Sequence, residues 1–165
     1  MFIYARKSRI LALMALDSTD IRLLEALQRD AHLTAHDLGE VLNLSPSQAG
    51  RRRQRLESEG YITHYSAHLR HDKLGLTVQA FVQVQMARHG PDASKAFKRM
   101  VETQPAITSV WTLTGDADYL LRVYTTDLKG LNDLIQNVLL AHPGIARVQS
   151  QIVMEQLKAD APLPL

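Results

Sequence analysis

The fold of the first half of this chain is decided by the stretch Leu44-Ser45-Pro46-Ser47-Gln48-Ala49-Gly50-Arg51-Arg52-Arg53-Gln54-Arg55-Leu56. Ser45 is a favourable N-cap, Pro46 suits the first helical position, and Gln48 stands where a capping box places its reciprocal acceptor. The rest of the stretch is rich in arginine and contains no acidic residue. A short cationic helix is therefore predicted. Such a helix fits the major groove of DNA, although a solvated charged helix is the ordinary alternative.

Two amphipathic helices are predicted immediately before this stretch. The cap cluster 17–20 precedes apolar residues at helical spacing, which indicates a first helix over about 18–30. Thr34 opens a second helix that ends at Asn43, and one residue then leads to the next cap. The helix opened by Thr34 and the basic helix after it are thus joined by a very short turn, which is typical of a helix-turn-helix. The β-prone residues 61–66 suit a small wing or return strand.

The second half of the chain has a different pattern. Apolar and polar residues alternate, or β-branched and aromatic residues cluster, in four predicted strands at 78–86, 107–114, 119–125 and 145–157. Amphipathic helices are predicted between the first and second strands and between the third and fourth. The order β-α-β-β-α-β is the ferredoxin-like arrangement. The sequence therefore predicts an α+β protein, with a winged helix-turn-helix domain followed by a ferredoxin-like domain.

Composition limits the classes of function. The chain has 165 residues and a formal net charge of +2, and the excess of basic residues lies entirely within residues 1–75. Cysteine is absent, so disulfides and thiolate chemistry are excluded. The start of the chain resembles a signal peptide only faintly, and no apolar run approaches the roughly 20 residues that span a bilayer. We expect a cytoplasmic protein with no membrane partner, and Met14 is an alternative initiator.

The predicted basic helix has two sides. At about 100° per residue, Ala49 and Leu56 fall on one side and pack on the preceding helices, with Arg52 and Arg53 flanking them. The opposite side is free to meet double-stranded DNA, through base edges for Gln48 and Arg51 and through phosphates for Arg55 and the serines. Arg52 and Arg53 are also candidates for structural pairing with acidic residues. The predicted DNA-binding residues are Ser45, Ser47, Gln48, Arg51, Arg52, Gln54 and Arg55.

Several motifs together resemble one family of regulators. They are Leu16-Asp17-x-x-Asp20-x-x-Leu23-Leu24-x-x-Leu27-Gln28, Leu44-Ser45-Pro46-Ser47, Arg52-x-x-Arg55-Leu56-Glu57-x-x-Gly60-Tyr61-Ile62, Gly115-Asp116-x-Asp118-Tyr119-Leu120-Leu121 and Pro143-Gly144-Ile145. In this order and spacing they resemble the Lrp/AsnC family of feast/famine transcription regulators. The resemblance covers about 16–158. Two positions depart from the family pattern: Arg53 stands where an aliphatic residue is usual, and Ala117 where an aromatic residue is frequent.

The resemblance implies a DNA-binding transcription regulator that responds to a small effector. It implies dimerisation through the sheet of the second domain, further assembly, commonly to an octamer, and an amino acid or amino-acid catabolite bound between dimers. The predicted parts are an N-terminal extension (1–15), the DNA-binding domain (16–66), a connector (67–76), the effector-sensing and oligomerisation domain (77–157) and a tail (158–165).

The loop 115–118 is the predicted effector site. A free amino acid needs an anion for its ammonium and N–H donors for its carboxylate, which the aspartates and the open backbone of the loop can supply. Hairpin chemistry alone also explains a Gly-Asp-x-Asp sequence, and Asp118 and Asp127 are candidates for purely structural caps. The predicted effector-binding residues are Gly115, Asp116, Ala117, Asp118, Tyr119, Thr126 and Asp127.

Other kinds of function have weaker support. His64, His68 and His71 straddle a strand end and a loop and lack a cysteine partner, so no metal site is predicted. No nucleophile, phosphate loop or cofactor motif accompanies the loop aspartates, so no catalytic residue, cofactor or enzymatic activity is predicted. The open alternatives are an architectural DNA-compacting protein with little sequence specificity and an amino-acid-binding sensor without a DNA role.

Overall fold

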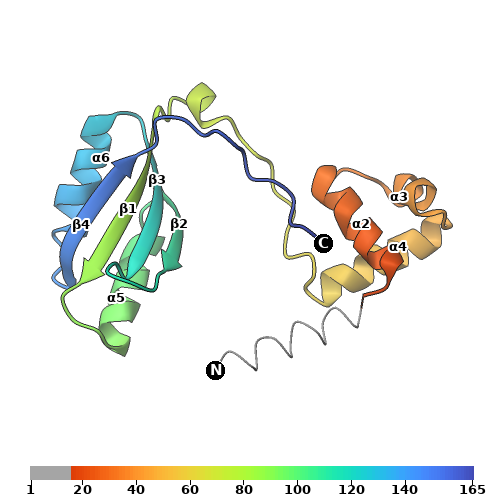
Figure 1. The fold of residues 1–165 in the computed structure, drawn as a ribbon, viewed down its shortest axis with the longest axis horizontal. Helices are drawn as coiled ribbons and strands as arrows, with labels where there is room; N and C mark the ends of the chain where they lie inside the picture. Colours follow the sequence, from red (N-terminus) through yellow and green to blue (C-terminus); the bar gives the residue numbers. More distant parts are fainter. Residues whose placement is uncertain (1–15) are drawn as a thin grey trace. The chain divides into compact units, whose positions relative to one another are not determined.

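The computed structural model describes residues 16–165, which form two compact units that we describe one at a time. One unit holds the helical segment up to Ala67 together with Lys158–Leu165, and the other is His68–Leu157 (Figure 1). The predicted extension 1–15, with the alternative initiator Met14, lies outside the described residues.

The first unit contains three helices, α2 (Ser18–Arg29), α3 (Ala35–Leu42) and α4 (Pro46–Ser58). Each begins with a complete capping box, in which the N-cap side chain and the third helical residue satisfy each other's backbone N–H. The predicted helix-turn-helix is therefore confirmed. Its buried core consists of Leu23, Leu27, Leu38, Leu42, Ala49 and Leu56.

The turn between α3 and α4 is tight. Asn43 ends α3 in the left-handed conformation, with φ 56°, and the N–H of Leu44 donates to the carbonyl of Gly39 at 2.9 Å. A Cβ added at Gly39 would lie 2.8 Å from the carbonyl oxygen of Leu44. Only glycine allows α3 to approach the start of α4 this closely. No sequence pattern indicates this constraint, because glycine inside a short helix usually only weakens the helix.

The prediction of a strand at 61–66 is wrong. Within residues 16–67 and 158–165 the structure contains no strand with which this segment pairs. Its β-prone residues act individually instead. Tyr61 and Ile62 pack against the helical core, and the hydroxyl of Tyr65 contacts α4. A high β-propensity indicates only that a segment fits a sheet, so it forms no strand where no partner is available.

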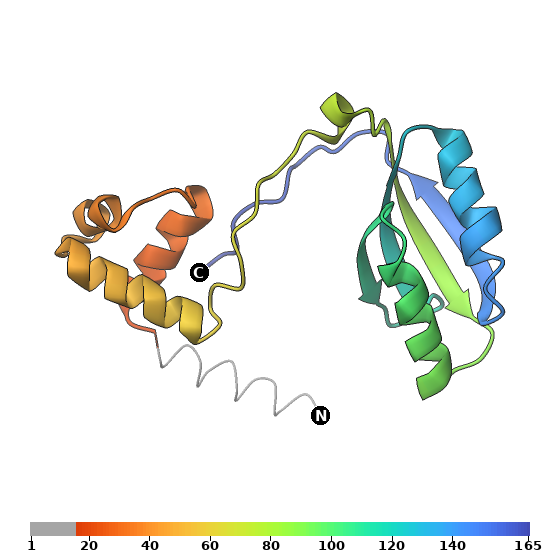
Figure 2. The same cartoon turned by 180° about the vertical axis from the view of Figure 1, so that it is seen from behind.

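The second unit is a four-stranded antiparallel sheet in the order β2-β3-β1-β4. The strands are β1 (Val78–Met86), β2 (Ile107–Thr112), β3 (Tyr119–Thr125) and β4 (Ile145–Ile152). Helices α5 (Pro91–Glu102) and α6 (Leu128–Leu134) lie on one face of the sheet, and the short 3-10 helix η1 (His71–Leu74) precedes β1 (Figures 1 and 2). The predicted ferredoxin-like order is confirmed.

Strand alternation divides the sheet into a covered face and an open face. Val82 and Val84 of β1 and Leu121 of β3 are fully buried beneath the helices, together with Phe97 of α5 and Leu139. The neighbouring strand positions point the other way and are not covered by α5 or α6, and the ring of His71 in η1 lies 5.0 Å from the ring of Tyr124 at one end of this face. That open face carries Phe81, Gln83, Trp111, Leu120, Arg122, Tyr124, Arg147 and Gln149, by the observed register.

Two element boundaries differ from expectation. The last strand stops at Ile152 rather than near 157, because Ile152 already pairs with Ala80 close to the start of β1. The sequence predicts one continuous helix between the third and fourth strands, but α6 ends at Leu134 and a π-helical turn, η2 (Ile135–Leu139), follows. The N–H of Leu140 there donates to the carbonyl of Ile135 at 2.8 Å. Periodicity alone does not separate such a turn from a continuous helix.

The tail returns to the helical unit. The side chain of Gln28 on α2 pairs with the backbone of Leu163, donating to its carbonyl at 3.2 Å and accepting from its N–H at 2.6 Å. The tail therefore has a specific contact with α2. Among residues 16–165, no helix combines the length and hydrophobicity needed to cross a membrane, and no group of three or more His, Cys, Asp or Glu side chains is arranged to hold a metal ion.

Candidate functional site

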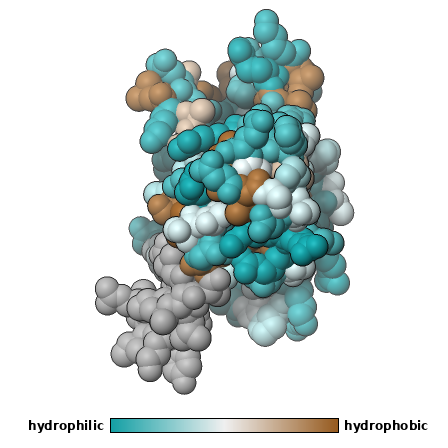
Figure 3. All heavy atoms as spheres, turned by 90° about the vertical axis from the view of Figure 1, so that its right-hand side faces the viewer, coloured by the Kyte–Doolittle hydropathy of each residue, from teal (hydrophilic) through white to brown (hydrophobic). Residues whose placement is uncertain are grey.

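The surface of α4 is the candidate nucleic-acid interface. Ala49 and Leu56 are fully buried, as predicted, and they fix which side of the helix faces the core. Seen from the side on which α3 and α4 lie in Figure 1, the surface is mostly hydrophilic, with isolated apolar residues rather than a broad apolar patch (Figure 3). A surface of this kind suits contact with a polar, charged partner.

Three of the predicted DNA-binding residues form one exposed row on α4. Ser47, Arg51 and Gln54 stand at positions i, i+4 and i+7, so their side chains lie along one face. Arg51 makes no hydrogen bond or ion pair with any residue of the described part of the chain. Its guanidinium therefore keeps all its donors available for bases or phosphates.

Ser45 and Gln48 are occupied by the helix cap. The Oε1 atom of Gln48 accepts from the backbone N–H of Ser45 at 3.0 Å and from its hydroxyl at 2.9 Å. Reading adenine with two hydrogen bonds would use both ends of the Gln48 amide. The Oε1 end already serves the cap, so Gln48 offers its amide nitrogen alone unless the capping box opens.

Arg53 is a structural residue. Its guanidinium donates to Glu57 at 3.0 Å, to the hydroxyl of Tyr65 at 3.1 Å and to the carbonyl of Leu33 at 3.0 Å. It also lies over the ring of Tyr65, 4.9 Å from the ring centre. The hydrogen bond from Tyr65 and that from Arg53 lower the pKa of Glu57 below its ordinary value. An ion pair and an aromatic partner therefore accommodate an arginine where the family that the sequence resembles usually has an aliphatic residue.

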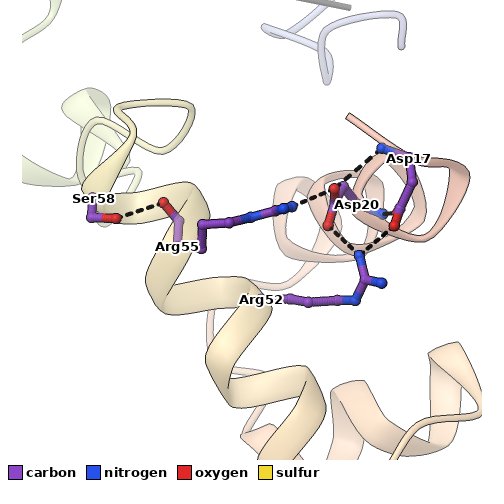
Figure 4. A network of polar contacts seen from close by, with 5 residues as sticks. All are labelled: Asp17, Asp20, Arg52, Arg55 and Ser58. Atoms are coloured by element: carbon purple, nitrogen blue, oxygen red, sulfur yellow. Dashed lines mark hydrogen bonds and ion pairs between the residues drawn. The ribbon is translucent and has the colours of Figure 1, made fainter. Parts of the chain in front are cut away.

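Arg52 and Arg55 both turn toward the first turn of α2 (Figure 4). Nη1 of Arg52 lies 2.7 Å from a carboxylate oxygen of Asp17 and 2.7 Å from Oδ1 of Asp20. Nη2 of Arg55 pairs with Oδ2 of the same Asp20. Hydrogen bonding from the backbone of Asp20 and then from Arg52 lowers the pKa of Asp17, and the bonds to Asp17 and Asp20 raise the pKa of Arg52.

This arrangement changes the reading of the basic helix. The prediction assigned Arg55 to DNA phosphates, and in this structure its guanidinium is paired with Asp20. Arg52 has the structural role that was one of its two predicted alternatives. The acidic partners stand more than 30 positions before the arginines in the chain, so local sequence analysis does not find them. Asp20 is thus a functional candidate that was missed.

The second candidate site is a small pocket on the open face of the sheet, about 50 Å³ in volume. Asp116 and Ala117 of the predicted loop line it, and four residues from the two neighbouring strands complete it. The four added residues are Gln83, Gln85, Arg147 and Gln149. Strand alternation places the two glutamines of β1 on the polar face, but the pairing of β1 with β4 that brings Arg147 beside them is not readable from sequence.

Asp118 serves the fold rather than this pocket. Its carboxylate accepts from the N–H of Met86 at 2.7 Å, and its backbone N–H donates to the carbonyl of Val84 at 2.9 Å. Nδ1 of His89 lies 3.5 Å from the other carboxylate oxygen. Gly115 has φ 117°, a conformation that favours glycine and lets the loop turn.

The other predicted effector residues lie elsewhere. The ring of Tyr119 stacks on Phe97, with centres 4.2 Å apart, and lines a separate cavity of about 480 Å³ between α5 and β2. Thr126 and Asp127 follow the far end of β3, a strand of seven residues, so within one chain they do not line the pocket of Asp116. Asp127 caps α6 by accepting from the N–H of Gly130 at 2.7 Å. The assignment of Tyr119, Thr126 and Asp127 to the effector site therefore stays a prediction, and none of the three lines this pocket within one chain.

Comparison with known proteins agrees with this architecture. A model for winged helix-turn-helix DNA-binding domains matches residues 16–63, and a model for the Lrp/AsnC ligand binding domain matches residues 79–163. The chain is 33% identical to the DNA-binding transcriptional activator DecR of Escherichia coli strain K12, over 91% of this chain and 99% of that protein. It is 33% identical to the Bkd operon transcriptional regulator of Pseudomonas aeruginosa, over 91% and 98%.

A solved structure shares the whole architecture. A transcriptional regulator of Neisseria meningitidis in complex with L-Met superimposes with a TM-score of 0.86 at 37% identity, over 90% of this chain and 96% of that one. Both halves of the present chain therefore match known regulators in the same order. The chain belongs to the Lrp/AsnC family of DNA-binding transcription regulators.

Proposed function

We propose that this regulator binds specific DNA sequences through the row Ser47, Arg51 and Gln54 on α4, with Ser45 and Gln48 at the helix start. The observation that carries the proposal is the state of Arg51, which is exposed and makes no polar contact with the described residues, whereas the other arginines of α4 are paired with acids. An arginine free of intramolecular partners grips a guanine edge or a phosphate without first breaking an ion pair.

The pocket beside Asp116 is the proposed effector site. Asp116 supplies an anion for an ammonium group, Arg147 supplies donors for a carboxylate, and the glutamines of β1 and β4 supply further donors and acceptors. This set of groups matches the zwitterion of a free amino acid. L-Met is the first ligand to test, since it is bound in the similar Neisseria regulator.

A second copy of the chain completes this site in our proposal. Ligand pockets are usually about 300–1,000 Å³, whereas this one has about 50 Å³, too little to enclose an amino acid. The pocket opens on the uncovered sheet face, which also carries Phe81, Leu120 and the 43% exposed Trp111. Packing two such faces together forms a dimer and buries the aromatic residues. Further assembly of dimers, to an octamer, then closes the effector site.

Ligand-induced thermal stabilisation tests the effector proposal. L-Met and then each other proteinogenic amino acid is added to the full-length protein, and the midpoint of thermal unfolding is measured. We expect one or a few amino acids to raise it, because a ligand that binds only the folded state stabilises that state. Asp116→Asn and Arg147→Gln should each abolish the shift, whereas Asp92→Asn, an exposed aspartate outside the pocket, should keep it. A shift that survives both pocket variants would exclude this site.

A further inference from the structure

Asp20 stands at the centre of the network in Figure 4. Its side chain is 1% exposed, yet it contacts two arginines of the recognition helix, Arg52 through Oδ1 and Arg55 through Oδ2. Oδ2 also accepts from the backbone N–H of Asp17 at 3.2 Å, as part of the α2 capping box. Both carboxylate oxygens are therefore used, and both arginines are held on the α2 side of α4.

The burial of Asp20 makes these contacts difficult to exchange for DNA. A carboxylate that loses its paired cations inside a protein is left without compensation, at a high cost in free energy. If Arg52 and Arg55 both turned to DNA phosphates, the buried carboxylate of Asp20 would lose both of its paired cations and incur that cost. The side chains of Arg52 and Arg55 are only 30% and 42% exposed, so much of each is already withdrawn from solvent.

We propose that Asp20 is a specificity-determining residue, which keeps Arg52 and Arg55 away from DNA phosphates and so limits the sequence-independent affinity of the protein. Phosphate contacts supply nearly all non-specific binding, whereas base contacts supply specificity. With three of the α4 arginines paired to acids, the helix presents Arg51 and neutral polar side chains to DNA. The inference rests on the proposed DNA-binding role of α4.

The salt dependence of DNA binding reports this role directly. Each phosphate contact lowers the slope of log K against log salt by about 0.9. Asp20→Asn keeps the shape of the side chain and an oxygen for the cap, but it removes the charge that holds the arginines. With random-sequence duplex, we expect this variant to bind several-fold tighter at low salt and to have a slope steeper by about 1–2. The preference of the variant for the DNA upstream of the protein's own gene, relative to random duplex, should fall.

The matched control is Glu25→Gln. Glu25 is on the same helix, and in the described part of the chain it makes no hydrogen bond or ion pair with α4. The substitution changes the net charge by the same amount, so any general electrostatic effect appears in both variants. The inference is overturned if both variants have the same slope, or if Asp20→Asn loses affinity for both duplexes with the slope unchanged.

A second pair of variants decides the question if Asp20→Asn does not fold. Arg51→Gln and Arg55→Gln make the same chemical change on the same helix. We expect Arg51→Gln to reduce the salt slope by about 1 and Arg55→Gln to leave it nearly unchanged, because Arg55 is paired with Asp20 whereas Arg51 has no polar partner among the described residues. Equal reductions would overturn the role of Asp20. Equal binding of wild type to random and upstream duplex would instead refute the proposed sequence specificity, while the slopes still test Asp20.

Discussion

At the scale of single residues, the charge of an arginine does not reveal what it binds. Arg51, Arg53 and Arg55 lie within one turn and a half of α4. Arg51 has no polar partner within residues 16–165, whereas Arg53 holds Glu57 and Tyr65, and Arg55 holds Asp20. The buried side of the helix was predictable, since Ala49 and Leu56 are the apolar positions of the stretch. The pairing was not, because it depends on acids that approach only after folding.

Arg53 and Arg51 should separate stability from DNA binding. Arg53→Ala removes contacts to Glu57, Tyr65 and the carbonyl of Leu33, so we expect it to lower the free energy of unfolding by about 1–2 kcal/mol. Arg51→Ala removes an unpaired side chain and should leave stability unchanged. Chemical denaturation of the two variants measures both effects. Equal losses of stability would contradict the different roles assigned to them.

The lowered pKa of Glu57 predicts that the folded protein loses stability in acid. Tyr65 and Arg53 lower its pKa in the folded state below the ordinary value of 4.5. A carboxyl group whose folded pKa is depressed adds stability above its unfolded pKa, and this stability is lost as the pH falls through the folded value. The midpoint of thermal unfolding of the helical unit should therefore fall more steeply below about pH 4.5 in wild type than in Glu57→Gln. Parallel curves for the two proteins would contradict the pairing.

At the scale of helices and strands, the sequence predicts the helix caps but not the close contacts between neighbouring elements. Ser45 and Gln48 form the capping box that their spacing predicts, and the strand alternation of β1 gives its buried face. The close approach of Gly39 to Leu44, the end of β4 and the π-helical turn η2 depend on neighbouring elements. Local propensity carries no information about those neighbours.

Two glycines inside helices should respond oppositely to the same substitution. A Cβ at Gly39 would lie 2.8 Å from the carbonyl oxygen of Leu44, so Gly39→Ala should destabilise the helical unit by about 1–3 kcal/mol. A Cβ at Gly50 would meet only the Cβ of Ala35 at 3.6 Å, an ordinary contact. Gly50→Ala should therefore gain about 0.5–1 kcal/mol from helix propensity. Denaturant titrations compare the two, and a stabilising Gly39→Ala would refute the tight turn.

At the scale of the whole molecule, assembly is expected to depend on the open face of the sheet. Leu120 lies on that face, paired with Trp111 and Gln83 in the observed register. Leu120→Glu places a charge there and should reduce the mass measured by light scattering to that of a smaller species. Leu128→Glu makes the same change on α6, where the leucine is 59% exposed on the opposite face, and should retain the wild-type mass. Unchanged mass for Leu120→Glu would exclude this face.

In our proposal, assembly also links the two candidate sites. Two copies of α4 read DNA with a fixed spacing only if the chains are joined, so dimerisation adds specificity that one helix does not have. The domain order and the fold class were predictable from motif spacing and strand alternation. The pocket proposed to bind the effector was only half predictable: its loop is visible in the sequence, whereas Arg147 and Gln149 come from a strand that pairs alongside.

The most direct test of the account compares two affinities of the full-length protein at physiological salt. One is for the DNA upstream of its own gene, and the other is for random duplex of equal length. Specific regulators prefer their sites by about 10³-fold or more. We expect a preference of that order in wild type, most of it lost in Arg51→Ala and retained in Arg53→Lys, which keeps a charge at the paired position. Equal affinity for both duplexes would contradict sequence-specific regulation and favour an architectural role.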